Sequence, residues 1–275
     1  MSYLVAHLAE RHAVTLLTLE RANVPSFYPL PDSVQQIRID KLGGRRIKRL
    51  FRVLSRPLQI RQAVRVLAPD VVVSFMDTMN VTALIGCLGL DIPVIVSERN
   101  DPALHRIGRA KEAVRDRIYS LARLVVAQTR RVARYFPASL QPKLRIIANP
   151  VPRATLSARP DRPNAEGRMR IISVGRLEPH KGFDRLIEAF ALTVDERPDW
   201  DLVIIGEGPE RSRLETLVRR HDLDHRIHFP GVVKDVFREL AASHLMAFPS
   251  RYEGFPNALA EALAAGLPAV GQKGV

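Results

Sequence analysis

Residues 170–194 read RIISVGRLEPHKGFDRLIEAFALTV, and this stretch contains the pattern that decides the fold. It opens with an apolar run, residues 170–174, of the kind that forms a buried strand. Two glycines and a proline follow within residues 175–182 and predict a turn. From residue 183 the apolar side chains recur at helical spacing and share one face: Phe183, Leu186, Ile187, Phe190 and Val194. The stretch therefore predicts a strand, a turn and a helix in succession.

The same order repeats on both sides of this stretch. Short apolar runs, typical of strands buried on both faces, alternate with helical patterns. The expected strands are 14–19, 71–75, 92–96, 124–127, 144–147, 170–174, 202–205, 226–229 and 245–248. Helices are expected at the start of the chain, around 81–88 and 113–122, and after Pro209, Asp235 and Pro256. This alternation predicts an α/β protein with doubly wound parallel sheets.

The chain is expected to form two domains, because 275 residues exceed the usual size of one hydrophobic core. Prolines at 150, 152, 160 and 163 indicate that residues 151–168 are a linker between domains 1–150 and 169–275. The first domain begins on a helix rather than on a strand. The second ends soon after the apolar stretch 267–270. We therefore expect a protein truncated at both ends, with the first strand of one domain missing and the other domain incomplete.

Charge is distributed unevenly between the two halves. Residues 1–150 contain 24 Lys and Arg against 11 Asp and Glu, whereas residues 151–275 contain 18 of each kind. The net charge of +13 therefore lies in the first half. Such asymmetry predicts an anionic partner for that half. A single cysteine, Cys87, excludes an internal disulfide and a cysteine-rich zinc site, and we expect it in the core.

The segment 41–69 contains nine basic residues and no acidic one. Its apolar residues Ile47, Leu50, Phe51 and Leu54 recur at helical spacing, so the segment predicts a basic amphipathic helix. Three interpretations remain open: a solvated face of a packed helix, contact with an anionic membrane surface, or nucleic-acid binding. Nucleic acid is the weakest of the three, because no recognised motif or aromatic interleaving accompanies the charges. No segment is long and apolar enough to span a membrane, so a cytoplasmic protein is expected.

The turn 174–182 has the composition of an anion-binding loop. It leaves a strand and enters a helix, which is where open α/β sheets bind their ligands. Gly175 allows close approach of backbone, and Arg176 and Lys181 add two cations. The turn is thus a candidate diphosphate site, although an ordinary loop with solvated cations has the same composition.

The segment 249–263 has a similar strand, glycine turn and helix pattern. From residue 258 to 267 every residue except Glu261 is Ala, Leu or Gly, so we expect the helix to be buried on all sides. A buried carboxylate needs hydrogen-bond donors, which a ribose diol or an internal arginine would supply. Glu253 lies just before the helix, within reach of a ligand at the helix N-terminus.

Other enzyme signatures are incomplete. The segment Gly206-Glu207-Gly208-Pro209-Glu210-Arg211 has arginine where a dinucleotide-binding fingerprint has its third glycine, which argues against a dehydrogenase. The Asp-x-Asp pairs at 199–201 and 222–224 precede strands instead of following them, so we interpret them as surface and capping residues rather than metal ligands.

Several motifs occur together in order: Gly175-Arg176 with Lys181-Gly182, Gly206-Glu207-Gly208-Pro209, Phe229-Pro230-Gly231, and Glu253 with Glu261 beyond it in a Glu-x7-Glu pattern. In this combination the chain resembles glycosyltransferase family 4, over essentially its whole length. The resemblance implies the GT-B fold, with two Rossmann-like domains facing a cleft. It also implies a hexosyltransferase that uses a nucleotide-diphosphate sugar, retains the anomeric configuration, and needs no metal or other cofactor.

The resemblance also implies roles for individual residues. Arg176 and Lys181 would stabilise the donor diphosphate, with Glu253 as the third catalytic residue. The donor-binding residues would be Gly175, Val232, Val233, Gly254, Phe255, Pro256, Asn257 and Glu261, with Glu261 on the ribose. We expect substitution of either cation to lower turnover more than stability.

In the first domain the segment Ser97-Glu98-Arg99-Asn100-Asp101-Pro102 follows a strand. It resembles a segment of bacterial polysaccharide and lipid-linked oligosaccharide transferases, so Glu98, Arg99 and Asn100 are candidate acceptor-side residues. Many relatives have a histidine near this position, and this chain does not. The implied reaction moves a hexose or N-acetylhexosamine to a saccharide or lipid-linked saccharide during cell-surface polysaccharide synthesis. A sugar-nucleotide-binding fragment without activity and a GT-B nucleotide-sugar epimerase are the alternatives.

Overall fold

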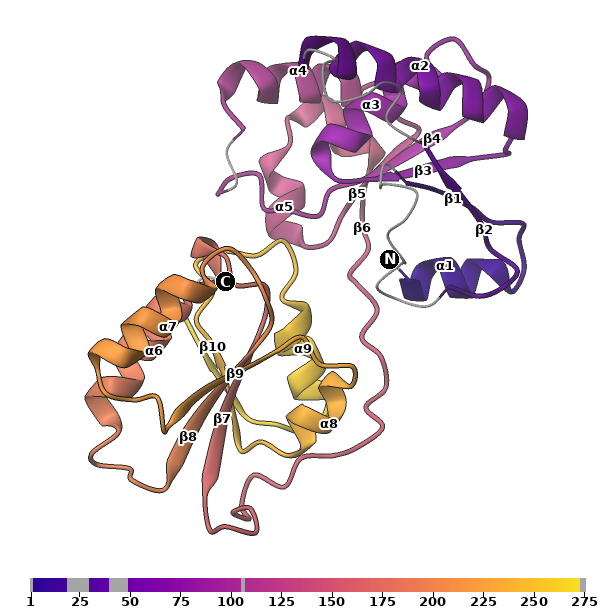
Figure 1. Cartoon of the computed structure of the whole chain (residues 1–275). Coiled ribbons are helices and arrows are strands. Elements are labelled where there is room, and N and C mark those ends of the chain that lie inside the picture. The colour runs from indigo at the N-terminus through magenta and orange to yellow at the C-terminus, as the bar shows by residue number, and fades with distance from the viewer. Residues whose placement is uncertain (1, 19–29, 40–48, 105–106, 273–275) are drawn as a thin grey trace. The chain divides into compact units, whose positions relative to one another are not determined.

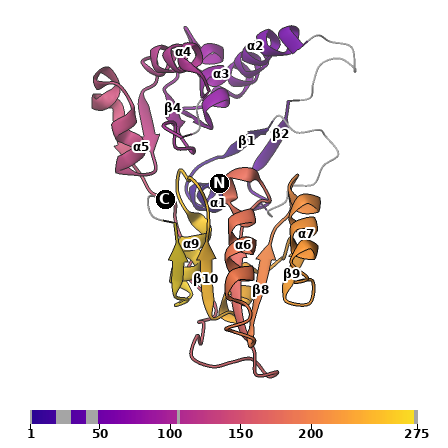
Figure 2. The ribbon, with the colours of Figure 1, turned by 90° about the vertical axis from the view of Figure 1, so that its left-hand side faces the viewer.

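The computed structural model describes residues 2–18, 30–39, 49–104 and 107–272, with the side chains of residues 2 and 49–54 left aside. The chain divides into two compact units, Met1–Pro150 and Val151–Val275 (Figures 1 and 2). We refer to them as unit 1 and unit 2.

The described part of unit 1 contains two parallel sheets. The larger has the order β3-β4-β5-β6 and the smaller pairs β1 with β2. The strands are β1 (Thr15–Thr18), β2 (Gln35–Arg38), β3 (Val72–Phe75), β4 (Val94–Ser97), β5 (Leu124–Ala127) and β6 (Leu144–Ile146). The helices are α1 (Ser2–Ala9), α2 (Arg49–Leu67), α3 (Asp77–Cys87), α4 (Arg109–Tyr119), α5 (Arg130–Tyr135) and the 3-10 turn η1 (Ala138–Lys143).

The core of unit 1 forms where α2 and α3 pack against the larger sheet. Ile60 and Val64 of α2 and Leu84 of α3 lie against Val96 and Val125 of the sheet. The helices approach closely at Gly86, where a side chain would contact the carbonyl oxygen of Pro57 at 2.8 Å. The expectation that Cys87 is a core residue is confirmed, since it is buried in the same cluster.

Unit 2 contains one parallel sheet of order β11-β10-β7-β8-β9. Its strands are β7 (Met169–Val174), β8 (Trp200–Ile205), β9 (Ile227–Gly231), β10 (Leu245–Phe248) and β11 (Ala269–Gly271). Its helices are the 3-10 turn η2 (Pro179–Lys181), α6 (Phe183–Thr193), α7 (Arg211–Arg220), α8 (Val236–Ala241) and α9 (Asn257–Ala264).

Helices cover both faces of the unit 2 sheet (Figure 1). Phe183 and Ile187 of α6 and Leu214 of α7 pack on one face, around Leu202. The other face packs against α8 and α9, where Ala262 meets Met246 and Phe248 of β10 and Ile172 of β7 in a second cluster. The predicted doubly wound α/β architecture is therefore confirmed.

Helix α5 and the turn η1 were not predicted, and two further elements differ from the sequence-based expectation. Strand β2 was not predicted, because it contains the polar residues Gln35, Gln36 and Arg38 and so lacks the apolar run typical of a strand. Its parallel pairing with β1 stabilises it as a strand. Helix α9 is not buried on all sides: Ala262 is its one buried residue, and Leu263 is 57% exposed. An all-apolar composition removes the periodicity that shows which face of a helix is covered.

Candidate functional site

Most of the predicted donor-site residues of unit 2 lie on loops at the carboxyl edge of its sheet, and Asn257 and Glu261 lie on helix α9. The chain runs outward from β7 through β8 to β9 and then returns to place β10 on the opposite side of β7. The loops after β7 and β10 are consequently neighbours although about 70 residues separate them in sequence. A reversal of strand order of this kind is the usual position of a ligand crevice in an open α/β sheet.

Glycines allow these loops to pack backbone against backbone. Gly182 has a φ of 71°, and a Cβ atom there would overlap the carbonyl oxygen of Pro249. Gly206 has a φ of 140°, and a Cβ atom would overlap the carbonyl oxygen of Gly175. Both positions require glycine for its conformation and for its lack of a side chain. The loops after β7, β8 and β10 are thus held in direct contact.

Lys181 and Glu253 meet between the loops. The Nζ atom of Lys181 lies 2.6 Å from Oε1 of Glu253, and the hydroxyl of Ser250 donates to the same oxygen at 2.8 Å. The two charged side chains are 20% and 12% exposed. The structure therefore brings together a cation and a carboxylate that the resemblance assigned separately to the diphosphate and to the donor sugar.

Arg176 is far more accessible than Lys181. Its side chain is 71% exposed, and its Nε atom lies 3.1 Å from a carboxylate oxygen of Glu178. The other oxygen of Glu178 lies 3.3 Å from Nδ1 of His180, whose ring stacks on Tyr252 with 5.0 Å between ring centroids. An exposed arginine with one ion pair can reorient at little cost when a stronger anion arrives.

Arg251 was not predicted as a site residue, yet it joins both loops. Its guanidinium donates to the carboxylate of Asp184 at 2.8 and 3.0 Å and to the carbonyl oxygen of Pro179. Its backbone N–H donates to the carbonyl oxygen of His180 at 2.8 Å. Burial alone would raise the pKa of Asp184, but the hydrogen bonds from Arg251 and from the backbone of Arg185, together with the charges of Arg251 and Arg213, outweigh burial and lower the pKa. In the sequence Arg251 is one charge in an exposed-looking loop, and nothing there indicates its partner 67 residues away.

Glu261 lies on α9, partly buried. Burial raises the pKa of its carboxyl group. Among the residues that the structure describes, no side chain or backbone N–H binds that carboxyl group, so the internal arginine considered from the sequence is not found. A partly desolvated carboxylate of this kind favours a ligand that donates hydrogen bonds.

The remaining donor-site candidates lie at the same edge. Gly254, Phe255 and Pro256 are partly exposed between Glu253 and α9, and Asn257 is the first residue of α9. Val232 and Val233 directly follow β9: Val232 is exposed, and Val233 packs against the core. Gly175 directly follows β7 and is partly buried.

In unit 1, Glu98 lies in the core instead of on an accessible surface. It is 2% exposed, and the hydroxyl of Tyr119 donates to its carboxyl group at 3.0 Å. The amide of Asn80 donates in turn to that hydroxyl at 2.9 Å. Burial raises the pKa of Glu98 to about 7, against the lowering effects of Tyr119 and Arg115. Glu98 is therefore placed to support the segment 98–102 rather than to touch a substrate.

This burial predicts a pH-dependent stability. Because the folded pKa of about 7 exceeds the ordinary 4.5, the unfolded chain releases this proton first as pH rises. The contribution of protonated Glu98 to the free energy of unfolding is fully present below pH 4.5 and is lost as pH rises to about 7. Relative to Glu98→Gln, the free energy of unfolding of the unaltered protein should fall by about 3 kcal/mol over that range. Urea unfolding of both proteins at several pH values measures the difference, and equal pH slopes would contradict the assignment.

The other acceptor-side candidates are more accessible. Arg99 and Asn100 follow β4 and are both partly exposed. Arg99 donates to the side-chain oxygen of Asn149, and its guanidinium carbon lies 4.8 Å from the centre of the Phe75 ring. These contacts hold Arg99 at the carboxyl edge of the larger sheet of unit 1.

The predicted amphipathic face of the basic segment lies outside the described residues. Residues 40–48 are not described, nor are the side chains of 49–54, so nothing tests the face formed by Ile47, Leu50, Phe51 and Leu54. Farther along α2, Arg61 donates to the carbonyl oxygens of Gly86 and Leu88 at 3.2 and 2.6 Å. At least this one of the nine basic residues serves packing.

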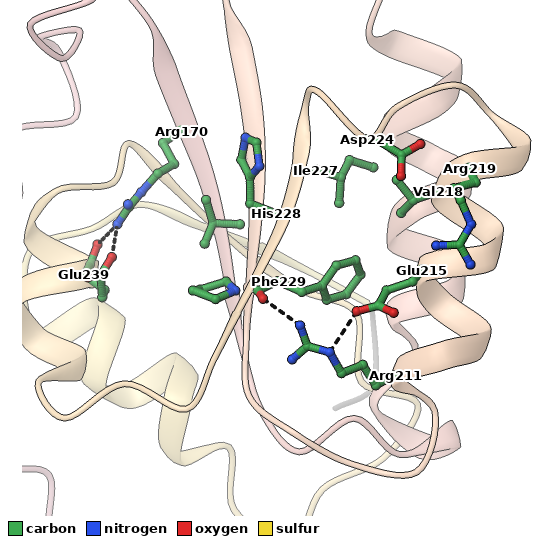
Figure 3. A pocket seen from close by; sticks show the side chains of 12 residues that line it. Arg170, Arg211, Glu215, Val218, Arg219, Asp224, Ile227, His228, Phe229 and Glu239 are labelled. Atoms are coloured by element: carbon green, nitrogen blue, oxygen red, sulfur yellow. Dashed lines mark hydrogen bonds and ion pairs between the residues drawn. The ribbon is translucent and has the colours of Figure 1, made fainter.

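A cavity of about 580 Å³ lies along the edge strand β9 (Figure 3). It contains none of the predicted donor residues. Figure 3 shows charged side chains already paired around it: Arg170 with Glu239 at 2.8 Å, and Arg211 with Glu215 at 2.8 Å. Since the ion pairs satisfy these cations internally, we do not assign the donor site to this cavity.

Two kinds of feature are absent from the described residues. No helix there has the length and apolar character to cross a membrane. No three His, Cys, Asp or Glu side chains in the same residues gather as metal ligands would. The expectation that catalysis needs no metal stays a prediction.

Two family models identify the family. Residues 1–154 match the model of Glycosyltransferase Family 4, and residues 156–274 match the model of Glycosyl transferases group 1. The chain belongs to glycosyltransferase family 4, as the motifs indicated.

Individual relatives agree with this placement. The chain is 26% identical to an uncharacterised glycosyltransferase of Methanocaldococcus jannaschii over 80% of its own length and 59% of that relative. It is 25% identical to the GalNAc-α-(1→4)-GalNAc-α-(1→3)-diNAcBac-PP-undecaprenol α-1,4-N-acetyl-D-galactosaminyltransferase of Campylobacter jejuni, covering 93% and 70% of the two chains. The Anabaena protein HepE in complex with UDP-glucose superposes with a TM-score of 0.74 at 17% identity, covering 94% and 80%. The structural likeness confirms the GT-B fold.

Proposed function

We propose that this chain catalyses retaining transfer of a hexose or N-acetylhexosamine from a nucleotide-diphosphate sugar. The acceptor is a saccharide or a lipid-linked saccharide in cell-surface polysaccharide synthesis. The observation that supports the proposal best is the meeting of Lys181 and Glu253 at the point where the strand order reverses. A nearby cation and carboxylate suit a donor that presents a diphosphate and sugar hydroxyls together.

The proposed roles follow from charge and accessibility. Lys181 and Arg176 stabilise the negative charge that develops on the diphosphate as its bond to the anomeric carbon breaks. Glu253 accepts hydrogen bonds from the sugar, and Glu261 accepts them from the ribose. The acceptor hydroxyl forms its new bond on the face that the diphosphate leaves, and its proton passes to the departing phosphate oxygen. No metal is required, because the two cations supply the positive charge.

The proposal is tested with a panel of nucleotide sugars. Incubation of the full-length protein with each donor should give slow hydrolysis to the nucleoside diphosphate, even without an acceptor. A variant with both Arg176→Ala and Lys181→Ala is the control and should give no detectable hydrolysis of the donor. Binding of a donor without hydrolysis or transfer would instead identify a protein that only binds sugar nucleotides.

Substitution of Glu261 tests the ribose assignment. Glu261→Gln should weaken nucleotide-sugar binding by about 1 kcal/mol or more, because a neutral amide is a poorer acceptor than a carboxylate. Calorimetry on both proteins measures the change. Since Leu263 lies on the exposed part of the same helix, Leu263→Gln is a matched control that should bind normally. Unchanged affinity in a folded Glu261→Gln protein would remove the ribose assignment.

We further propose that the protein is cytoplasmic and contacts the inner membrane surface through the basic segment 41–65. Vesicles with anionic lipid should sediment with the protein and release it as salt rises, because exposed charges are screened over about 10 Å at 0.1 M salt. Neutral vesicles should bind little. A variant with five Gln substitutions, at Arg45, Arg46, Lys48, Arg49 and Arg52, should lose most of the binding.

A control with the same change in charge separates a local contact from general attraction. It substitutes five exposed arginines of unit 2 by Gln: Arg153, Arg159, Arg162, Arg219 and Arg220. This control should still bind. Equal sedimentation of the unaltered protein and the segment 41–65 variant would assign that segment to a solvated helix face.

A further inference from the structure

Arg99 is a partly buried cation without an anionic partner. In the described parts of the chain no carboxylate lies within 4.0 Å of its guanidinium, which contacts the amide of Asn149 and the ring of Phe75. Burial lowers the pKa of Arg99, so removal from water is already costly. Partly buried arginines are usually paired with acids, as Arg168 is with Asp201.

The acids closest to Arg99 in sequence are engaged elsewhere. Glu98 accepts from the hydroxyl of Tyr119, and its raised pKa of about 7 reduces its negative charge near neutral pH. Asp101 forms an ion pair with Arg131 at 2.9 Å. The potential around the Arg99 guanidinium is therefore left positive.

The hydrogen bonds of Arg99 involve one nitrogen of its planar guanidinium group, Nη1. Asn149 accepts from the Nη1 atom, and Gln128 also accepts from Nη1 at 2.8 Å when its amide takes the orientation that satisfies its neighbours. Within the described structure, Nε and Nη2 of Arg99 have no acceptor. A guanidinium edge with two free N–H directions matches two oxygens of one phosphate.

Residues at the carboxyl ends of the other three strands of the larger sheet surround this cation. Phe75 ends β3, Arg99 follows β4, Gln128 follows β5, and Asn149 follows β6. All four strands are parallel, so these residues share the carboxyl edge, where open α/β sheets bind ligands. Arg99 is thus held by the fold and is not a mobile surface side chain.

Backbone strain at the same edge is a second observation. Met76, next to Phe75, has a φ of 75° and a ψ of 140°, and its N–H donates to the carbonyl oxygen of Ser97 at 3.2 Å. Such a conformation costs a residue other than glycine about 1 to 3 kcal/mol and tends to occur at functional sites. Here the hydrogen bond to Ser97 holds this strained residue beside Phe75, at the end of β3.

We propose that Arg99 binds a phosphate group of a substrate at the carboxyl edge of unit 1, with Nε and Nη2 toward its oxygens. The assignment of that phosphate to a substrate rests on the proposed function. The phosphate belongs either to an acceptor joined through a phosphate ester or to the donor. The phosphate chemistry is the same in both cases.

Titration with inorganic pyrophosphate tests the site without needing any transfer reaction. The experiment uses the full chain carrying Arg176→Ala and Lys181→Ala, which removes the cations of the proposed donor site. Adding Arg99→Gln should weaken pyrophosphate binding at least tenfold in calorimetry. Arg134→Gln, which removes an exposed arginine of α5, is the matched control and should leave the affinity unchanged. Equal affinities for the background and its Arg99→Gln form would overturn the proposal.

A second variant guards against loss of folding. Arg99→Lys retains the charge but not the fork, so it should weaken pyrophosphate binding several-fold in a protein whose thermal unfolding is little changed. A folded Arg99→Lys protein with full affinity would also overturn the proposal. Because these measurements need no activity, failure to observe sugar transfer leaves their outcome intact.

The source of the phosphate is distinguished by UDP. UDP affinity is measured in the protein that retains Arg176 and Lys181, with and without Arg99→Gln. If Arg99→Gln leaves UDP affinity unchanged but weakens pyrophosphate binding in the Arg176→Ala, Lys181→Ala background, the site is assigned to the acceptor's phosphate. A tenfold loss of UDP affinity assigns it to the donor. Both results support a phosphate site at Arg99.

Discussion

Lys181→Ala should lower the turnover of sugar transfer by about 10²- to 10³-fold, because removal of one preorganised group at a developing charge has effects of this size. Lys181 is the less exposed of the two cations proposed for the diphosphate, so water compensates least for its loss. Initial rates at saturating donor measure the change. A variant with full turnover would show that the diphosphate lies elsewhere.

The structure changes what Lys181→Ala should do to stability. The sequence suggested a solvated loop cation whose loss would leave thermal unfolding unaltered. Lys181 instead forms a largely buried ion pair, and its removal leaves Glu253 with the hydroxyl of Ser250 as its one remaining side-chain donor among the described residues. Of the two substitutions, Arg176→Ala is the better test of an effect on activity without an effect on stability. Its side chain is mostly exposed, so we expect reduced turnover with unfolding changed by less than about 0.5 kcal/mol.

Gly182→Ala should destabilise unit 2 by about 2 to 4 kcal/mol, since it adds the cost of a positive φ to an overlap of atoms. The overlap is with the backbone of Pro249, which a rigid strand end cannot easily avoid. Urea unfolding measures the loss. Any movement of the loops would also separate Lys181 from Glu253, so donor affinity should fall as well.

Gly266→Ala is the matched control for this substitution. Gly266 has a φ of 74°, close to the 71° of Gly182, but a Cβ atom added there would have no atom of the described structure within 4 Å. The substitution should cost only about 1 kcal/mol. Similar losses for the two variants would mean that conformation, and not loop contact, accounts for the effect at Gly182.

Much of the fold was predictable because its strands are apolar runs between turn residues. Residues 124–127 and 245–248 were assigned to strands with the bounds that the structure gives. Prediction failed where tertiary contacts decide: polar β2 forms by pairing with β1, and the exposure of Leu263 depends on which elements cover α9. The composition of a segment shows neither its strand partner nor which elements cover it.

The donor-site candidates were predictable as a set of residue types, and their pairing was not. Motif spacing does not indicate that Lys181 would contact Glu253, since this depends on β10 lying beside β7. Arg251 was missed for the same reason. Burial of Glu98 was missed because its polar neighbours suggested an accessible loop, whereas Asn80 and Tyr119 hold it inside.

The position of β10 beside β7 has a consequence for how the protein acquires its site. The two strands become neighbours only after β8 and β9 have been passed, so closing this contact fixes a loop of about 70 residues and depends on non-local contacts. A chain folded only as far as β9 has the Lys181 loop but not the Glu253 loop. Such an intermediate lacks half of the proposed donor site, so a donor that binds there would stabilise the completed unit and not its precursors.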